Sequence, residues 1–283
     1  MHLPFSLRFL LLAGAALVVA SLRAAGPPEA EKAAAALALL NPELPSLFIA
    51  SDSTAAKSYN PGQVGWGEPF PHYFDTDKLN VINLARGGRS SRTFQTEGWW
   101  QQLLDHAKPG DFVLIQFAHN DATEIDSPKA RGTIRGLGDE TWEVDNAVTG
   151  ERETVHTFGW YVRQMIASAQ ERGLRVIIVS PTIQNSWHDG QIARDPVGYR
   201  AWLKVLAKEA GLPFVDLSGM AADDLQAMGP EQTRELYQGK THFQLGGAEL
   251  HAQLVVIGLH RLPGQPLDGY LSKAGEILVG MQP

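Results

Sequence analysis

Short apolar runs alternate with helical patterns along most of this chain, and this alternation constrains its fold more than any other feature. The first run begins at Leu47, and four more follow, at Leu79–Leu84, Phe112–Phe117, Arg175–Ser180 and Leu212–Leu217. Each run is short and rich in β-branched or aromatic residues, which is typical of strands buried on both faces of a sheet. Helical patterns lie between and after these runs, at 99–107, 157–172, 199–210 and 247–259.

Strands that alternate with helices predict a parallel sheet, because each strand returns beside its neighbour through a helical crossover. We expect a three-layer α/β fold with five parallel strands in a flavodoxin-like order. The 283 residues suffice for one such domain, which we place at 47–283. Residues 134–155 interrupt the alternation, and we interpret them as a functional or mobile segment over the carboxyl edge of the sheet.

The amino terminus has the pattern of a secretory signal peptide. A charged start precedes an apolar run at 9–20, and small residues follow it. The run is shorter than the roughly 18 residues of a membrane helix, and an uncleaved anchor is the alternative interpretation. We predict a signal peptide at 1–25, a linker at 26–46 with one short helix over 29–40, and a secreted or periplasmic protein without a membrane span after cleavage.

Composition excludes several classes of function. The net charge of -7 argues against general binding of nucleic acids, which needs a basic surface. The chain has no cysteine, so disulfides, thiolate nucleophiles and cysteine zinc sites are excluded. The histidines match no metal-binding spacing, and a family resemblance, which rests on the segments named below, implies that the protein uses no metal and no organic cofactor.

Polar residues suited to acyl transfer lie at the predicted carboxyl edge of the sheet, where ligands bind in open α/β folds. Ser53 follows the first strand, Gly88 the second and Asn120 the third, and His242 precedes the last helix. A serine hydroxyl needs a base such as histidine, and the oxyanion that forms needs N–H donors placed in advance. Taken singly, each residue also has a plain structural interpretation, as a turn or a helix cap.

The ordered set of these segments resembles the SGNH hydrolase superfamily and, within it, the rhamnogalacturonan acetylesterases. The matching segments are Ser51-Asp52-Ser53-Thr54, Gly65-Trp66-Gly67, Gly88-Arg89-Ser90-Ser91-Arg92, His119-Asn120-Asp121, residues 153–160 and His242. The resemblance runs from about Leu47 to Leu259. It implies a carbohydrate esterase that removes acetyl groups from pectic rhamnogalacturonan, an acetylated acidic polysaccharide, through an acetyl-enzyme.

The resemblance also implies a role for each residue. Ser53 would be the nucleophile, and the oxyanion hole would consist of its own N–H, the N–H of Gly88 and the side-chain amide of Asn120. His242 would take the proton from Ser53 and return it to the leaving sugar hydroxyl. Asp121 is interpreted as a brace for its loop rather than as a base.

The chain departs from the family pattern near its last histidine. Gly239 stands three residues before His242, where the family has an aspartate that orients the imidazole. Losing the equivalent carboxylate costs serine proteases about four orders of magnitude in turnover. Three interpretations stay open: a backbone carbonyl orients His242, a carboxylate elsewhere such as Glu235 does so, or the site is weak or inactive. The change at Ala118, where the family usually has glycine, is small.

A cluster of arginines is the candidate for recognition of an acidic substrate. Arg86, Arg89 and Arg92 are close in sequence, and guanidinium groups suit carboxylates, although solvated charge and loop anchoring are alternatives. Sugar rings stack on aromatic side chains, and three tryptophans are candidates for such stacking, Trp66, Trp142 and Trp187. We select Arg89 and Trp187 as the predicted substrate-binding residues.

Two other functions remain open. One is an SGNH esterase that acts on a different acetylated glycan or a small ester. The other is a glycan-binding protein with little or no catalysis, which the glycine at 239 suggests. The oligomeric state is not predicted.

Overall fold

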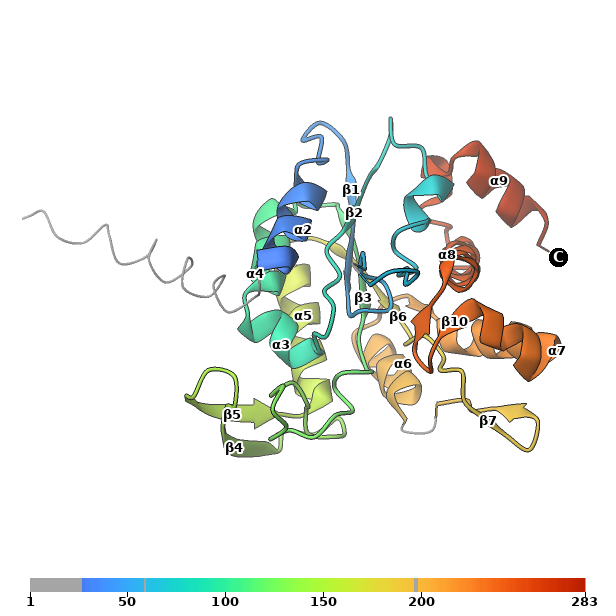
Figure 1. The fold of residues 1–283 in the computed structure, drawn as a ribbon. Coiled ribbons are helices and arrows are strands. Elements are labelled where there is room, and N and C mark those ends of the chain that lie inside the picture. The colour runs from blue at the N-terminus through green and yellow to red at the C-terminus, as the bar shows by residue number, and fades with distance from the viewer. Residues whose placement is uncertain (1–26, 59, 196–197, 283) are drawn as a thin grey trace, which may run out of the picture.

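The computed structural model describes residues 27–58, 60–195 and 198–282. Its centre is a sheet of five parallel strands in the order β2-β1-β3-β6-β9 (Figure 1). The strands are β1 (Ser46–Ser51), β2 (Asn80–Asn83), β3 (Phe112–Gln116), β6 (Arg175–Val179) and β9 (Phe214–Val215). When these five strands are numbered 1 to 5 along the chain, their order across the sheet is 2-1-3-4-5. The predicted α/β fold with a flavodoxin-like sheet is therefore confirmed.

The position of β1 determines where a site can form. Every residue of β1 and of β3 is buried, and the two strands pair in parallel from Leu47↔Phe112 to Ser51↔Gln116. β1 also pairs with β2 on its other side. The strand order reverses between β1 and β3, and in open sheets the crevice beyond the carboxyl ends opens at such a reversal.

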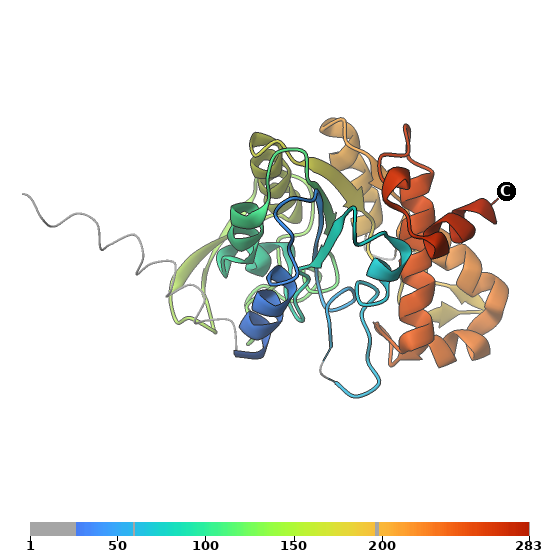
Figure 2. The same ribbon diagram turned by 90° about the horizontal axis from the view of Figure 1, so that it is seen from above.

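Helices cover both faces of the sheet (Figures 1 and 2). One face carries α2 (Pro27–Leu37), α3 (Ser91–Thr96), α4 (Trp99–His106), α5 (Phe158–Glu171) and α6 (Tyr199–Glu209). The other face carries η1 (Phe70–Tyr73), α7 (Leu217–Leu236), α8 (Leu245–His260) and α9 (Lys273–Gly280), with the 3-10 helix η2 (Asp268–Tyr270) between α8 and α9. Alternation along β1 feeds both layers, since Phe48 packs in one apolar cluster and Ile49 in the other.

The four predicted helices are present as α4, α5, α6 and α8, with ends within a few residues of those expected. The sequence did not predict α7. This helix is broken at Gly229, whose φ of 81° lies outside the helical region, and Pro230 follows it. Glycine and proline inside a helical pattern hid one long element that consists of two helical parts.

The segment predicted as a linker takes part in the fold. Its helix, α2, spans 27–37 where the sequence predicted 29–40. Ala33 is completely buried and belongs to the apolar cluster shared with α5 and α6. The predicted signal peptide at 1–25 lies outside the described residues.

The irregular segment predicted at 134–155 contains a hairpin. Its strands are β4 (Thr141–Asp145) and β5 (Arg152–His156), which pair antiparallel. Val144 and Val155 are buried while most of their neighbours are exposed, so each strand turns one residue toward the protein interior. Asn146 closes the turn, where its side-chain oxygen accepts a hydrogen bond from the N–H of Val148 at 2.9 Å.

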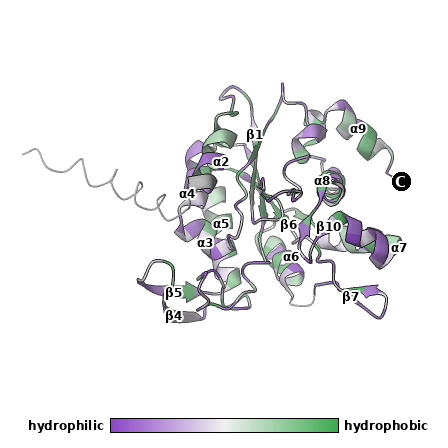
Figure 3. Cartoon of the chain, viewed as in Figure 1, coloured by the Kyte–Doolittle hydropathy of each residue, from purple (hydrophilic) through white to green (hydrophobic). Residues whose placement is uncertain are grey.

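Two shorter hairpins complete the described chain, β7 (Trp187–His188) with β8 (Gln191–Ile192), and β10 (Tyr237–Gln238) with β11 (His242–Phe243). Figure 3 shows hydrophobic residues along the sheet strands and a mixture of hydrophobic and polar residues on the helices around them. In the part of the chain that the structure describes, no helix has both the length and the apolar character to cross a membrane.

Candidate active site

Ser53 is presented by a tight turn directly after β1. The carboxylate of Asp52 accepts hydrogen bonds from the N–H of Thr54 at 2.8 Å and from its hydroxyl at 2.7 Å. The backbone carbonyl of Asp52 accepts from the N–H groups of Ala55 and Ala56. Because Asp52 is buried and occupied in this way, it holds the turn and leaves Ser53 as the partly exposed residue at its tip.

Gln116 fastens the strand ends beneath this turn. Its side-chain oxygen accepts hydrogen bonds from the Ser51 hydroxyl at 3.0 Å and from the Trp66 indole at 2.9 Å. Its amide nitrogen donates to the backbone carbonyl of Ser180 at 3.0 Å, just beyond β6. Trp66 is completely buried below the site, so this candidate for stacking on a sugar ring is not available to a substrate.

The hairpin β10–β11 brings His242 to Ser53. The distance from Ser53 Oγ to His242 Nε2 is 3.0 Å. The next residue, Phe243, is completely buried and stacks on the imidazole of His251 with ring centroids 4.2 Å apart. The N–H of Val64 also donates to the carbonyl of Phe243 at 3.0 Å. These contacts fix the hairpin, so the position of His242 does not depend on its own side chain.

One cavity of about 390 Å³ is lined by Ser53, Gly88, Asn120 and His242 together. Within the described chain, the N–H groups of Ser53 and Gly88 donate to no acceptor. Gly88 has a φ of 77°, in the left-handed region that glycine adopts without strain. Two backbone donors without partners in a cavity that also holds a nucleophile suit a developing oxyanion.

Asn120 is held so that its amide can serve the same cavity. One amide hydrogen donates to the carbonyl of Arg89 at 2.8 Å, and the second has no acceptor among the described residues. The neighbouring carboxylate of Asp121 accepts from the N–H of Ser91 at 3.1 Å and from its hydroxyl at 2.5 Å. Asp121 thus ties the loop after β3 to the start of α3, as a brace and not as a base facing Ser53.

Burial shifts the pKa values of His242 and of Asp121 in opposite directions. It lowers the pKa of His242 below the usual histidine value, and the charge of Asp52 opposes that shift. It raises the pKa of Asp121 to about 7, against the hydrogen bonds from Ser91. A lowered pKa keeps the imidazole of His242 neutral at pH 7, which is the form that can accept a proton.

No carboxylate among the described residues contacts the far side of the His242 ring. Within the described chain, Ser53 is the only residue to which the His242 side chain is hydrogen-bonded. Glu235, the substitute considered from the sequence, is exposed on α7 and makes no such contact. Gly239 has a φ of 76°, and a Cβ built on it meets no atom within 4 Å. Of the three interpretations, the structure therefore supports neither the backbone carbonyl nor Glu235.

The predicted substrate-binding residues do not line the cavity that holds Ser53. Arg89 pairs with Glu97 at 2.8 Å, and it donates to the carbonyl of Gly87 at 2.9 Å. The indole of Trp187 donates to Asn185 at 2.9 Å, and its ring packs against the core.

The other two arginines of the cluster are buried. Arg92 pairs with Glu153, with nitrogen–oxygen distances of 2.8 and 2.5 Å. The cluster that is dense in sequence is therefore not one solvent-facing surface.

Four cations that sequence reasoning missed do line this cavity: Lys32, Lys57, Lys129 and Arg131. No motif signalled them, because Lys129 and Arg131 follow β3 by more than ten residues in an irregular segment. Within the described chain, no group of histidine, cysteine, aspartate or glutamate residues is arranged to hold a metal ion.

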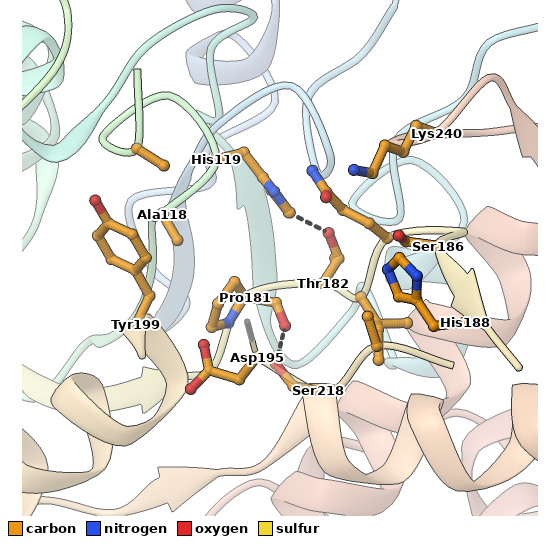
Figure 4. Close-up of a pocket in the computed structure, with 14 residues that line it drawn as sticks. Ala118, His119, Pro181, Thr182, Ser186, His188, Asp195, Tyr199, Ser218 and Lys240 are labelled. Atoms are coloured by element: carbon orange, nitrogen blue, oxygen red, sulfur yellow. Dashed lines mark hydrogen bonds between the residues drawn. The ribbon is translucent and has the colours of Figure 1, made fainter. Parts of the chain in front are cut away.

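Figure 4 shows a second cavity, of about 290 Å³. The same two loops contribute to both, since His119 lines one and Asn120 the other, and Lys240 lines one and His242 the other. His119 Nε2 lies 2.9 Å from the hydroxyl of Thr182. This contact holds His119 as part of the cavity wall.

Comparisons with known proteins show the family to which the chain belongs. The family model described as the GDSL-like lipase/acylhydrolase family matches residues 52–250. A rhamnogalacturonan acetylesterase of Emericella nidulans is 32% identical over 208 residues, which are 73% of this chain and 81% of that protein. A rhamnogalacturonan acetylesterase of Bacillus subtilis is 29% identical over 243 residues, 80% of this chain and 93% of that protein. The crystal structure of Bacillus subtilis YxiM is similar with a TM-score of 0.64 and 27% identity, and it covers 80% of this chain and 58% of the YxiM chain.

Proposed function

Because the chain belongs to the GDSL-like lipase/acylhydrolase family and is a carboxylic ester hydrolase, we propose that it removes O-acetyl groups from pectic rhamnogalacturonan. The observation that carries the proposal is the 3.0 Å contact between Ser53 Oγ and His242 Nε2 in a cavity with unused N–H donors. Two relatives named as rhamnogalacturonan acetylesterases, each aligned over most of its length, support the choice of substrate.

The first half-reaction transfers the acetyl group to the enzyme. His242 Nε2 takes the proton of Ser53 Oγ while the oxygen attacks the acetyl carbonyl carbon. The carbonyl oxygen becomes an oxyanion, which the N–H groups of Ser53 and Gly88 and the free amide hydrogen of Asn120 stabilise. The bond to the sugar oxygen then breaks, and that oxygen takes the proton from His242 and leaves as a hydroxyl.

The second half-reaction restores the enzyme. His242 removes a proton from water while the water oxygen attacks the acetyl carbon bonded to Ser53 Oγ. The same donors stabilise the second oxyanion. When the bond to Ser53 Oγ breaks, that oxygen regains the proton from His242, and acetic acid leaves and ionises. No step requires a metal or an organic cofactor.

The lack of a carboxylate beside His242 supports a second candidate function. His242 lacks the partner that usually orients the base, which favours either a slow Ser–His dyad or a glycan-binding protein. An esterase for a different acetylated glycan or a small ester is the third candidate. These three candidates differ in what Ser53 contributes and in which acetylated substrate is used.

Ester hydrolysis by the Ser53→Ala variant tests the proposal. We expect the variant to release p-nitrophenol from its acetate ester at least about 10⁴-fold more slowly than the wild type. Ser58→Ala is the matched control, because the Ser58 side chain lines the same cavity without contacting His242. Equal rates for wild type and Ser53→Ala would leave the glycan-binding function. Acetate release from acetylated rhamnogalacturonan should exceed release from acetylated xylan, and the reverse order would assign a different glycan.

We also propose that the protein acts outside the cytoplasm. The support is the apolar run at 9–20 with small residues after it, together with a polymeric proposed substrate. Expression of the full chain in a bacterium that exports proteins should yield a mature protein that begins near residue 26. Recovery of the intact chain from the cytoplasm would contradict the proposal.

A further inference from the structure

The cavity that holds Ser53 is cationic, although the protein is acidic. The net charge of the chain is -7. Among the described residues, four basic side chains line the cavity, Lys32, Lys57, Lys129 and Arg131, and one carboxylate does, that of Glu29. A charge reversal confined to the reaction site attracts an anionic ligand to that place.

One basic side chain in the cavity is neutralised within the protein. Lys32 and Glu29 lie one helical turn apart on α2, and their charged groups are 2.8 Å apart. The other three, Lys57, Lys129 and Arg131, form no ion pair with any described residue. Three positive charges in the cavity are therefore available to a ligand.

Arg131 is the fixed member of this group. Its side chain is half-buried, whereas Lys57 and Lys129 are exposed. One terminal nitrogen of Arg131 donates to the carbonyl of Gly88 at 3.3 Å. Its Nε is buried and donates to no acceptor within the described chain. A buried donor without an acceptor is costly, and an anion bound there would remove that cost.

From this arrangement we infer that Arg131, assisted by Lys57 and Lys129, binds a carboxylate of the substrate. The inference rests on the proposed function and identifies the residues at the same site that recognise the acidic sugar of the substrate. Because Arg131 contacts Gly88, the bound carboxylate lies on the acetylated sugar or on the sugar next to it. A planar guanidinium suits this role, since it donates two parallel hydrogen bonds to a carboxylate.

This site differs from the one that the sequence suggested. Arg89, the predicted residue, is neutralised by Glu97, and Arg92 is neutralised by Glu153. Arg131 comes from the segment after β3 and reaches the cavity beside Gly88. Recognition of the acid therefore depends on a residue outside the motifs that identify the family.

The test compares an acidic substrate with its neutral form. Acetylated rhamnogalacturonan oligosaccharides are prepared with intact carboxylates and with the carboxylates reduced to alcohols, and kcat/KM is measured on each. The wild type should prefer the acidic form. In Arg131→Gln the ratio of acidic to neutral kcat/KM should fall roughly 10- to 100-fold, the range expected for a charge-assisted contact. An unchanged ratio in this variant would overturn the inference.

Arg152→Gln is the matched control. Arg152 is an exposed arginine on β5, paired with Asp145 at 3.2 Å, and it does not line the cavity. This substitution removes the same charge and should keep the wild-type ratio. Because Arg131→Gln can also disturb the loop at Gly88, the double variant Lys57→Gln/Lys129→Gln gives a second measurement at exposed positions. It should lower the ratio and weaken the salt dependence of KM for the acidic form.

A binding measurement separates this inference from the proposed function. Digalacturonate without acetyl groups is titrated calorimetrically into Ser53→Ala protein, with and without Arg131→Gln. Binding that is lost with Arg131→Gln supports the carboxylate site even if the wild type proves inactive on acetylated rhamnogalacturonan. Absence of binding to Ser53→Ala protein that retains Arg131 would overturn the site even if the wild type is an active acetylesterase.

Discussion

Ser53 Oγ and His242 Nε2 lie 3.0 Å apart although 189 positions separate the two residues in the chain. Burial lowers the pKa of His242, so the imidazole stays neutral below its ordinary value of about 6.5. Only the neutral ring can accept the Ser53 proton. We therefore expect kcat/KM for p-nitrophenyl acetate to fall with a midpoint below pH 6.5 as the pH is lowered. A midpoint above pH 6.5, or a rate independent of pH, would contradict the role of His242 as the base.

Replacement of Gly239 tests whether His242 lacks an orienting group. Gly239→Asp places a carboxylate three residues before His242, where a Cβ meets no other atom. We expect kcat to rise several-fold. The fall in kcat/KM on the acid side of the pH profile should move to higher pH, because a nearby negative charge raises a histidine pKa. The backbone φ of 76° should cost about 1 kcal/mol of stability with any side chain.

Gly239→Asn is the matched control for this change. Asparagine has nearly the same shape as aspartate and tolerates a positive φ, but it carries no charge. It should reproduce the loss of stability without the shift in the pH profile. A lower kcat in Gly239→Asp than in Gly239→Asn would show that another group already orients the imidazole.

Arg92 connects α3 to the hairpin β4–β5. Its side chain is completely buried, pairs with Glu153 in two hydrogen bonds and donates to the carbonyl of Gly132 at 2.8 Å. Arg92→Met should lower the free energy of unfolding by about 3 kcal/mol, because it leaves the Glu153 charge without its partner. Urea denaturation measures the change.

Two further variants separate the ion pair from packing. Arg152→Gln breaks an exposed pair and should cost less than about 1 kcal/mol. The double variant Arg92→Met/Glu153→Leu should recover part of the loss, because it removes both charges. A double variant that is less stable than Arg92→Met would show that the loss of stability in Arg92→Met does not come from the broken ion pair.

The sequence predicted those features that depend on neighbouring residues. Short apolar runs predicted the sheet, because a strand buried on both faces has a recognisable composition. Ser53, Gly88 and Asn120 each lie in the loop that follows a strand, so prediction of the strands also placed these residues at one edge. His242 depended on the family resemblance, since nothing local distinguishes it from a histidine in an ordinary turn.

The sequence could not predict which charges are neutralised in the folded chain. Arg89 and Arg92 looked equivalent, but their partners Glu97 and Glu153 lie at unrelated distances along the chain. Arg131 gave no signal, because it reaches the cavity through an irregular segment. Gly229 and Pro230 concealed α7 for a different reason, since they interrupt a helical pattern that resumes afterwards.

The imidazole of His251 should make the protein sensitive to acid. The side chain is completely buried on α8, stacks on Phe243 and shares its Nδ1 with the carbonyl of Gly247 at 2.8 Å. Burial lowers the pKa of His251 to about 4 in the folded protein, against about 6.5 in the unfolded chain. Below pH 6.5 the unfolded chain therefore gains a proton that the folded protein does not.

The sign of this effect follows from proton binding. The unfolded state binds more protons between pH 6.5 and 4, so stability falls as the pH falls through that interval. The loss in free energy of unfolding that His251 causes reaches about 3 kcal/mol near pH 4 and is zero above about pH 7.5. Urea denaturation at several pH values measures it.

His251→Phe removes the titrating group and keeps a ring against Phe243. Its loss of stability between pH 7.5 and 4.5 should be about 2 kcal/mol smaller than that of the wild type. The comparison at pH 7.5 serves as the reference, because His251 is neutral there in both states and any difference reports packing and the lost contact to Gly247. If the free energy of unfolding falls with pH by the same amount in both proteins, the buried imidazole takes up its proton as readily as an exposed one.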